Sequence, residues 1–165
     1  MPEVEYEYDD DPTRIDRQVV WTFLSEHAYW GRWRTRQVVE RQLDGAWRLV
    51  GAYVRETGEM VGFARAQSDG VVLAYLADVF VVQEHRGAGV GVGLVQKMIE
   101  DGPGAHFRWM LHTNDAHGLY RRFGFAEPDQ TYLERPATGA TPVSTAQPTT
   151  AQDVAGTEPP QLGGI

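Results

Sequence analysis

The sequence predicts a mixed α+β domain in which a mostly antiparallel sheet contains one parallel crossover. A short strand pattern and two helical patterns come first, and three consecutive strand patterns joined by short turns follow them. A strand, a glycine-rich loop, a helix and a further strand complete the order. The chain has 165 residues, of which 42% are hydrophobic, so we expect one domain with a substantial core. We assign residues 1–135 to this domain.

Composition argues against several classes of function. The net charge is −8 and no basic stripe is present, which argues against binding to nucleic acid. There are no cysteines, which excludes disulfides, thiolate metal sites and a cysteine nucleophile. The sequence shows no signal peptide and no apolar run near the ~20 residues that a membrane span needs. We therefore expect a cytoplasmic protein without a nucleic-acid or membrane partner.

The N-terminal part predicts a strand and two helices. Residues 3–8 alternate between polar and apolar, as in a strand with one buried face. After an acidic loop at residues 9–13, apolar residues recur at helical spacing up to Leu24. A second helix is expected to begin at the capping residue Thr35 and to end at Gly45.

The loop between these helices is unusually aromatic. Tyr29, Trp30 and Trp33 surround Gly31. One interpretation is that the rings close the edge of the core. The other is that they form a wall beside a substrate, and the sequence leaves both open.

The next three segments predict an antiparallel meander. They span residues 47–55, 60–66 and 71–82, with turns at 56–59 and 68–70. The second turn contains Asp69-Gly70, a strong hairpin signal. The third segment is longer than the usual strand of about 5–6 residues, so we expect a central strand that is bent or bulged.

The glycine-rich loop predicts an anion site. Glycine occupies every second position from Gly87 to Gly93, and helical spacing follows. Backbone N–H groups at a helix N-terminus favour negative charge, and glycine lets a phosphate approach the backbone. The loop therefore predicts a pyrophosphate-binding site.

The C-terminal part predicts a parallel strand and a short helix. Residues 107–112 follow a helix that follows a strand, so a right-handed crossover should place them parallel to that strand. Thr113 is expected to cap a short helix that ends at Gly124, and residues 125–134 to form a last strand or two. Residues 136–165 are rich in Pro, Thr, Gly and Ala, and we expect a disordered tail.

Two motifs identify a family. The segment Arg86-Gly-Ala-Gly-Val-Gly91 resembles the Arg/Gln-x-x-Gly-x-Gly/Ala signature of the GNAT (Gcn5-related) N-acetyltransferases. Residues 116–125 are similar to the Ala-x-x-Leu-Tyr-x-x-x-Gly-Phe segment of that family. The resemblance covers roughly residues 3–135 and implies the GNAT fold.

The resemblance also implies a reaction and its ligand sites. An acetyl group would pass from acetyl-CoA to a primary amine of a small molecule or peptide, by direct attack in a ternary complex. The backbone of Val79, Phe80 and Val81 would bind the pantetheine arm. The pyrophosphate would be held by Arg86, Gly87, Ala88, Gly89, Val90, Gly91 and Val92.

The chain departs from the family pattern at one position. Many members carry Asn seven residues before the motif tyrosine, where this chain has Thr113, and Asn114 follows one residue later. Thr113 can still hydrogen-bond CoA while capping the helix. We therefore place both Thr113 and Asn114 beside the cofactor.

The resemblance implies roles for two further residues. Tyr120 would protonate the departing thiolate, which suits a phenol with an ordinary pKa near 10; the alternative is a core tyrosine. Asp78 lies in an apolar strand and is our candidate base, because burial could raise its pKa. Its alternative role is bonding to neighbouring backbone, and Glu26 is a weaker candidate base. Tyr29, Trp30 and Asp78 would face the acceptor.

Four other interpretations of the sequence were weighed against its motifs: a metal site, a dinucleotide site, a P-loop and a non-catalytic module. His112 and His117 match no metal signature, so we expect structural roles for them and no metal. A dinucleotide site would want a third glycine where Val92 stands, and a P-loop would need Lys after Gly93. A non-catalytic acyl-CoA-binding or regulatory module on the same fold stays open. The resemblance also allows a homodimer, whose interface the sequence does not define.

Overall fold

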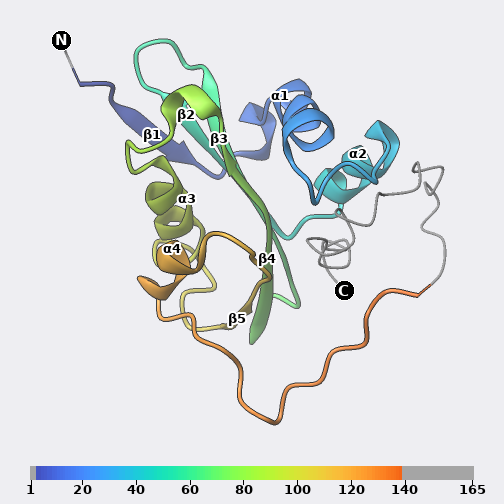
Figure 1. The fold of residues 1–165 in the computed structure, drawn as a ribbon. Helices are drawn as coiled ribbons and strands as arrows, with labels where there is room; N and C mark the ends of the chain where they lie inside the picture. The colour runs from blue at the N-terminus through green and yellow to red at the C-terminus, as the bar shows by residue number, and fades with distance from the viewer. Residues whose placement is uncertain (1–2, 139–165) are drawn as a thin grey trace.

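The protein is built on a five-stranded sheet, seen in a computed structural model that describes residues 3–138 (Figure 1). The strands lie in the order β1-β2-β3-β4-β5, and only the β4–β5 pair is parallel. The strands are β1 (Tyr6–Asp9), β2 (Arg48–Val54), β3 (Met60–Ser68), β4 (Leu73–Val81) and β5 (Arg108–Met110). The predicted α+β class, meander and parallel crossover are confirmed.

Helices cover both faces of the sheet. They are α1 (Arg17–Thr22), α2 (Arg36–Asp44), α3 (Val90–Met98) and α4 (His117–Arg121). The first two pack on one face, where Val20 and Leu43 meet Phe63 and Phe80. The other two pack on the opposite face, against β2, β3 and β4 (Figure 1). The apolar residues thus form two cores, one on each side of the sheet.

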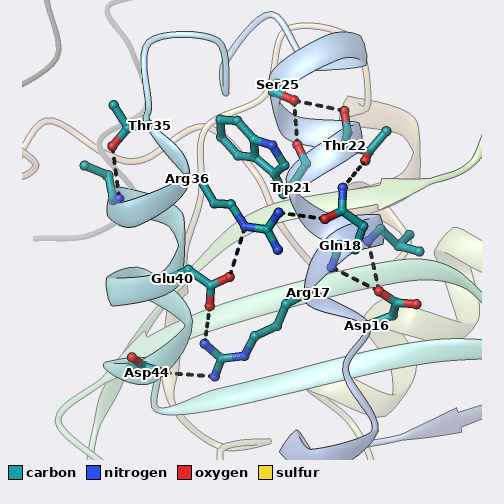
Figure 2. A network of polar contacts seen from close by, with 12 residues as sticks. Asp16, Arg17, Gln18, Trp21, Thr22, Ser25, Thr35, Arg36, Glu40 and Asp44 are labelled. Carbon is teal, nitrogen blue, oxygen red and sulfur yellow. Dashed lines mark hydrogen bonds and ion pairs between the residues drawn. The ribbon is translucent and has the colours of Figure 1, made fainter.

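Side-chain caps and ion pairs fix the first two helices relative to each other. The Asp16 side chain accepts hydrogen bonds from the backbone at the start of α1, and Thr35 caps α2 as predicted. Figure 2 shows Arg17 of α1 reaching two carboxylates of α2, at 2.6 Å from Glu40 and 2.8 Å from Asp44. The helices therefore hold both ends of the aromatic loop between them.

β4 is irregular where the sheet opens. Its ladder with β3 continues to Val81, but its ladder with β5 covers only Leu73 to Tyr75. Asp78 has a φ of +53°, and the pairing with β3 shifts register nearby, which confirms the expected bulge. Past Tyr75 the two parallel strands therefore separate.

The expected strand at residues 125–134 is wrong. The structure shows an irregular, mostly exposed segment there. Pro128 has no N–H to donate, and the Asp129 side chain accepts from the backbone of Thr131 in a local turn, so the segment is interrupted before it can pair. Of the tail predicted over 136–165, residues 139–165 lie outside the described residues.

Candidate functional site

The glycine loop has the backbone that the sequence predicts. Gly87 and Gly89 have φ values of +79° and +78°, which residues other than glycine rarely adopt. A Cβ at either position would meet no atom within 4 Å, so the loop faces open space. Gly89 is the residue before α3, and no side chain caps this helix. Its first N–H groups have no partner within the helix and can receive an anion.

Arg86 shapes the loop. Its Nε donates a hydrogen bond to the carbonyl oxygen of Val81 at 3.0 Å, which ties the loop to the end of β4. Its guanidinium also lies 6.0 Å from the centre of the Phe23 ring. Arg86 therefore anchors the loop to β4.

The glycines of the motif do different things. A Cβ at Gly91 would make only ordinary contacts, at 3.7 Å from Leu119 and 3.9 Å from Val81. A Cβ at Gly93 would overlap the ring of Tyr8. Gly93 therefore serves the packing of α3 on β1, whereas Gly87 and Gly89 serve the loop.

A small pocket of about 70 Å³ lies where β4 and β5 separate. Residues predicted from distant parts of the chain line it together, namely Tyr29, Trp30, Asp78, Val79, Thr113 and Tyr120. Asn114 is exposed and does not line it. The side chain of Phe80 is in the core, stacked 4.0 Å from Phe23, so only its backbone is available to a ligand.

Tyr120 reaches this pocket from α4. It is 8% exposed, and its ring meets the edge of Phe125. Burial raises the pKa of Tyr120 to about 12, and the charge of Asp115 adds to the effect. Thr113 accepts a hydrogen bond from the backbone N–H of Ala116 at 3.0 Å, which supports the turn into α4. Tyr120 is therefore a protonated phenol at the floor of the pocket.

Asp78 is the centre of a buried ion cluster. Arg34 binds both of its oxygens, at 2.7 and 2.8 Å, and Nε of Arg65 donates to one of them at 2.9 Å. The indole N–H of Trp30 donates to it at 3.2 Å. The hydrogen-bond partners are thus side chains from the aromatic loop and from β3, and not the neighbouring backbone.

The expected pKa of Asp78 is wrong in direction. Burial alone would raise the pKa of this carboxyl, but the charges and hydrogen bonds of Arg34 and Arg65 outweigh it and hold the pKa below its ordinary value. A carboxylate held this way is a poor proton acceptor. Asp78 therefore does not suit the role of general base, and its role is to hold the loop on β4.

Neither Arg34 nor Arg65 is among the site residues predicted from the sequence. Arg65 is 0% exposed and lies in the buried part of β3 among apolar neighbours, so its charge was a usable signal for a buried acidic partner. Arg34 is 3% exposed and belongs to the aromatic loop, and nothing in its local pattern indicates a partner 44 positions away. Two guanidinium groups face one carboxylate, and Nη1 and Nη2 of Arg65 have no hydrogen-bond partner among the described residues.

A larger cavity adjoins the small pocket and shares His112, Thr113 and Tyr120 with it. It encloses about 940 Å³ between β5, α4 and the irregular segment 125–134, and none of its lining residues belongs to β4 or to the glycine loop. The pocket at the separation of β4 and β5 is far smaller but contains the predicted residues. We therefore take the smaller pocket as the candidate site.

The remaining predicted residues lie as follows. Glu26 is exposed and does not line the small pocket, whereas His112 does. Within residues 3–138, no group of three or more His, Cys, Asp or Glu side chains is placed to hold a metal ion. In the same part of the chain, no helix has the length and apolar character to cross a membrane.

Comparisons with known proteins agree with this geometry. The profile of the acetyltransferase (GNAT) family matches residues 7–125. A crystal structure of a GNAT-family protein from Xanthomonas campestris pv. campestris is 34% identical, with a TM-score of 0.74 over 83% of this chain and 95% of that one. A structure from Deinococcus radiodurans named as an acetyltransferase is 22% identical, with a TM-score of 0.62 over 82% of this chain and 94% of that one, and shows the fold alone.

A curated relative is similar over part of its length. The Gibberella zeae protein FG08082, which carries an acetyltransferase name, is 34% identical over 108 residues. These are 64% of this chain but 59% of that protein, so the match spans less than two thirds of the relative. The family profile, the solved structure and the site geometry agree, and the chain belongs to the GNAT family of acetyltransferases.

Proposed function

We propose that the protein is an acetyl-CoA-dependent N-acetyltransferase that acetylates a primary amine of a small molecule or peptide. One observation carries the proposal: the open glycine loop and the pocket that contains Tyr120 adjoin the same stretch of β4. Arg86 binds the carbonyl oxygen of Val81 at one end, and Asp78 and Val79 line the pocket at the other. A donor with a pyrophosphate and a thioester needs these two sites in line.

The residues fit the donor along its length. Backbone amides from Arg86 to Val92 would hold the pyrophosphate, because Gly87 and Gly89 leave open space there. The backbone of Val79, Phe80 and Val81 would bind the pantetheine arm, since β5 does not pair with this part of β4. Thr113 lines the pocket, where the thioester end of the donor would lie. Asn114 lies outside the pocket lining, and we assign it a contact with the cofactor at the edge of the site.

The pocket residues would then support acyl transfer. A new bond forms between the amine nitrogen and the acetyl carbon, and the bond from that carbon to sulfur breaks. Tyr120 gives its proton to the leaving thiolate, and the resulting phenolate takes up the proton that the attacking nitrogen loses. The raised pKa keeps the phenol protonated before this step. Tyr29 and Trp30 would face the acceptor, and their rings can attract a cationic amine.

The test combines an amine panel with calorimetry. Arylalkylamines, polyamines, amino sugars and a peptide N-terminus are incubated with acetyl-CoA, and release of free CoA thiol is followed. We expect acetyl-CoA binding and turnover of at least one amine. Binding of acetyl-CoA without turnover of any amine would refute the proposed enzymatic activity and favour a non-catalytic acyl-CoA-binding module.

Tyr120→Phe tests the proton donor. We expect kcat to fall by about 10²-fold because general-acid catalysis is lost, with unchanged acetyl-CoA affinity. Tyr53→Phe is the matched control: Tyr53 is also a buried tyrosine, 2% exposed, but lies outside the pocket, and its hydroxyl has no partner among the described residues. Equal kcat values for Tyr120→Phe and the wild type would remove Tyr120 from this role.

A further inference from the structure

The outer edge of β5 carries backbone groups without a partner. β5 is the last strand of the sheet and pairs only with β4 within residues 3–138 (Figure 1). The N–H of Arg108 donates to the carbonyl oxygen of Val72 at 2.8 Å, so the backbone polar groups of Arg108 face β4. Because successive residues of a strand direct these groups to opposite edges, the N–H and C=O of Trp109 face outward. This edge can therefore accept a further strand.

The larger cavity follows this edge and leads to the small pocket. Every residue from 107 to 113 lines it, and residues of the irregular segment 125–134 form the opposite wall. Its volume of about 940 Å³ lies within the usual size of ligand pockets, about 300–1,000 Å³. At a rise of about 3.3 Å per residue, the run along β5 matches an extended peptide of about six residues. Since His112, Thr113 and Tyr120 line both spaces, a molecule that lies along β5 ends at Tyr120.

The charges and rings along this path suit a positively charged end. Tyr29 and Trp30 line the small pocket, and aromatic rings attract a cation. Asp115 adds an exposed carboxylate at the rim of this pocket. Carboxylates also outnumber guanidinium groups in the wall of the larger cavity, with Glu100, Glu127, Asp129 and Glu134 against Arg108 and Arg121. The path is thus complementary to a chain that begins with an ammonium group.

The small pocket offers little help in removing a proton from a strongly basic amine. Among the described residues that line it, Asp78 is held by two guanidinium groups, both ring nitrogens of His112 have hydrogen-bond partners, and Asp115 is exposed to solvent. An α-amino group has an ordinary pKa of about 7.7–8.0, against about 10.4 for a lysine amine. A peptide N-terminus is therefore already in part a neutral nucleophile at neutral pH, whereas an alkylamine is almost entirely protonated.

We propose that the acceptor is the N-terminus of a peptide, which lies antiparallel to β5 as an added strand and brings its α-amino group to Tyr120. This inference rests on the proposed N-acetyltransferase function. His112 and Thr113 follow β5 and line the small pocket, so the N-terminus lies there and the peptide runs back past Trp109 through the larger cavity. The α-nitrogen gains the acetyl group and loses one proton, and CoA leaves as the thiol. Main-chain hydrogen bonds to an open sheet edge are a known mode of peptide recognition.

Two acceptors with the same nucleophile test whether the chain of the peptide is bound. One is an alanine-rich hexapeptide amide with a free N-terminus, and the other is alanine amide, which has the same α-amino group but no chain to pair with β5. We expect kcat/KM to be at least about tenfold higher for the hexapeptide, because only the longer acceptor gains hydrogen bonds along the edge.

An N-methyl scan of the hexapeptide tests the pairing itself. Each peptide carries one methyl group on a backbone nitrogen, which removes one N–H donor. We expect kcat/KM to fall by about tenfold at the residue opposite Trp109 and to change little at the residues on either side, whose amides point away from β5.

The contrary results separate this inference from the proposed function. If alanine amide is acetylated as well as the hexapeptide, or if N-methylation has equal effects at every position, the added strand is overturned and the N-acetyltransferase stands. If a second copy of the chain covers β5 instead, light scattering gives a dimer and the scan shows no dependence on position, which also overturns the proposal. If no peptide and no other amine is acetylated, the proposed function fails and this inference fails with it.

Discussion

Asp78 combines a buried carboxylate with a backbone conformation that is rare outside glycine. Its φ of +53° falls in the left-handed region, and such residues persist only when their surroundings hold them. Arg34, Arg65 and Trp30 supply that restraint. The sequence showed a carboxylate in an apolar strand, which marked Asp78 as a candidate site residue. It could not show which charges would face it, so burial was expected to dominate its pKa.

Asp78→Asn tests the cluster. The substitution keeps the size of the side chain but leaves two buried guanidinium groups without a counter-charge, so we expect the free energy of unfolding to fall by about 3–5 kcal/mol at neutral pH. Urea denaturation gives this value. The control is Glu5→Gln, which breaks an exposed ion pair with Arg55 and should cost no more than about 1 kcal/mol.

The difference in the free energy of unfolding between wild type and Asp78→Asn should depend on pH. The pKa of Asp78 is lowered in the folded state, so its contribution is present above the ordinary aspartate value of 3.8 and is lost as the pH falls below it. The gap between wild type and Asp78→Asn should therefore narrow below about pH 4. A gap that is equal at neutral and acidic pH would contradict the assignment.

At the scale of elements, the sequence located the loop and α3 well but could not assign each glycine. The positive φ values at Gly87 and Gly89 follow from turn chemistry that a local pattern can indicate. The contact of Gly93 with Tyr8 joins α3 to β1, 85 positions apart in the chain, and a local pattern carries no sign of it. Residues 125–134 show the opposite limit, because the sequence predicted a strand there that finds no pairing partner within residues 3–138.

Gly93→Ala and Gly91→Ala form a matched pair. In an open helix, alanine should stabilise by about 1 kcal/mol relative to glycine. At Gly93 the added methyl group would overlap the Tyr8 ring, so we expect a loss of about 1–3 kcal/mol instead. At Gly91 the surroundings accept a methyl group, and thermal unfolding should show no loss. Equal effects at the two positions would contradict the assigned packing.

At the scale of the whole molecule, the site lies where the two cores meet across β4. Tyr53 belongs to the core under α1 and α2, and Tyr120 belongs to the core under α3 and α4. Burial raises the pKa of each phenol to about 12. The order of elements and the apolar periodicity predicted the helices, the meander and the parallel crossover, but the ion cluster depends on side chains brought together by folding.

These two phenols predict how stability changes in alkali. In the unfolded chain they ionise near pH 10, whereas the folded protein keeps them protonated, so their contribution is complete below pH 10 and is lost as the pH rises toward 12. The free energy of unfolding should fall by up to about 2–3 kcal/mol for each phenol across this range. Urea denaturation at pH 9, 10 and 11 measures the slope, and Tyr53→Phe and Tyr120→Phe should each reduce it. An unchanged slope in both variants would contradict the prediction.

The most direct test of the account is a calorimetric titration of acetyl-CoA into the wild type, Gly89→Asp and Gly58→Asp. Gly58 also has a positive φ, +72°, and open space around it, but lies in a turn between β2 and β3. Both variants carry the same backbone strain, and only one places a carboxylate at the predicted phosphate site. We predict binding by the wild type and Gly58→Asp and none by Gly89→Asp. Binding by Gly89→Asp with wild-type affinity would contradict the account.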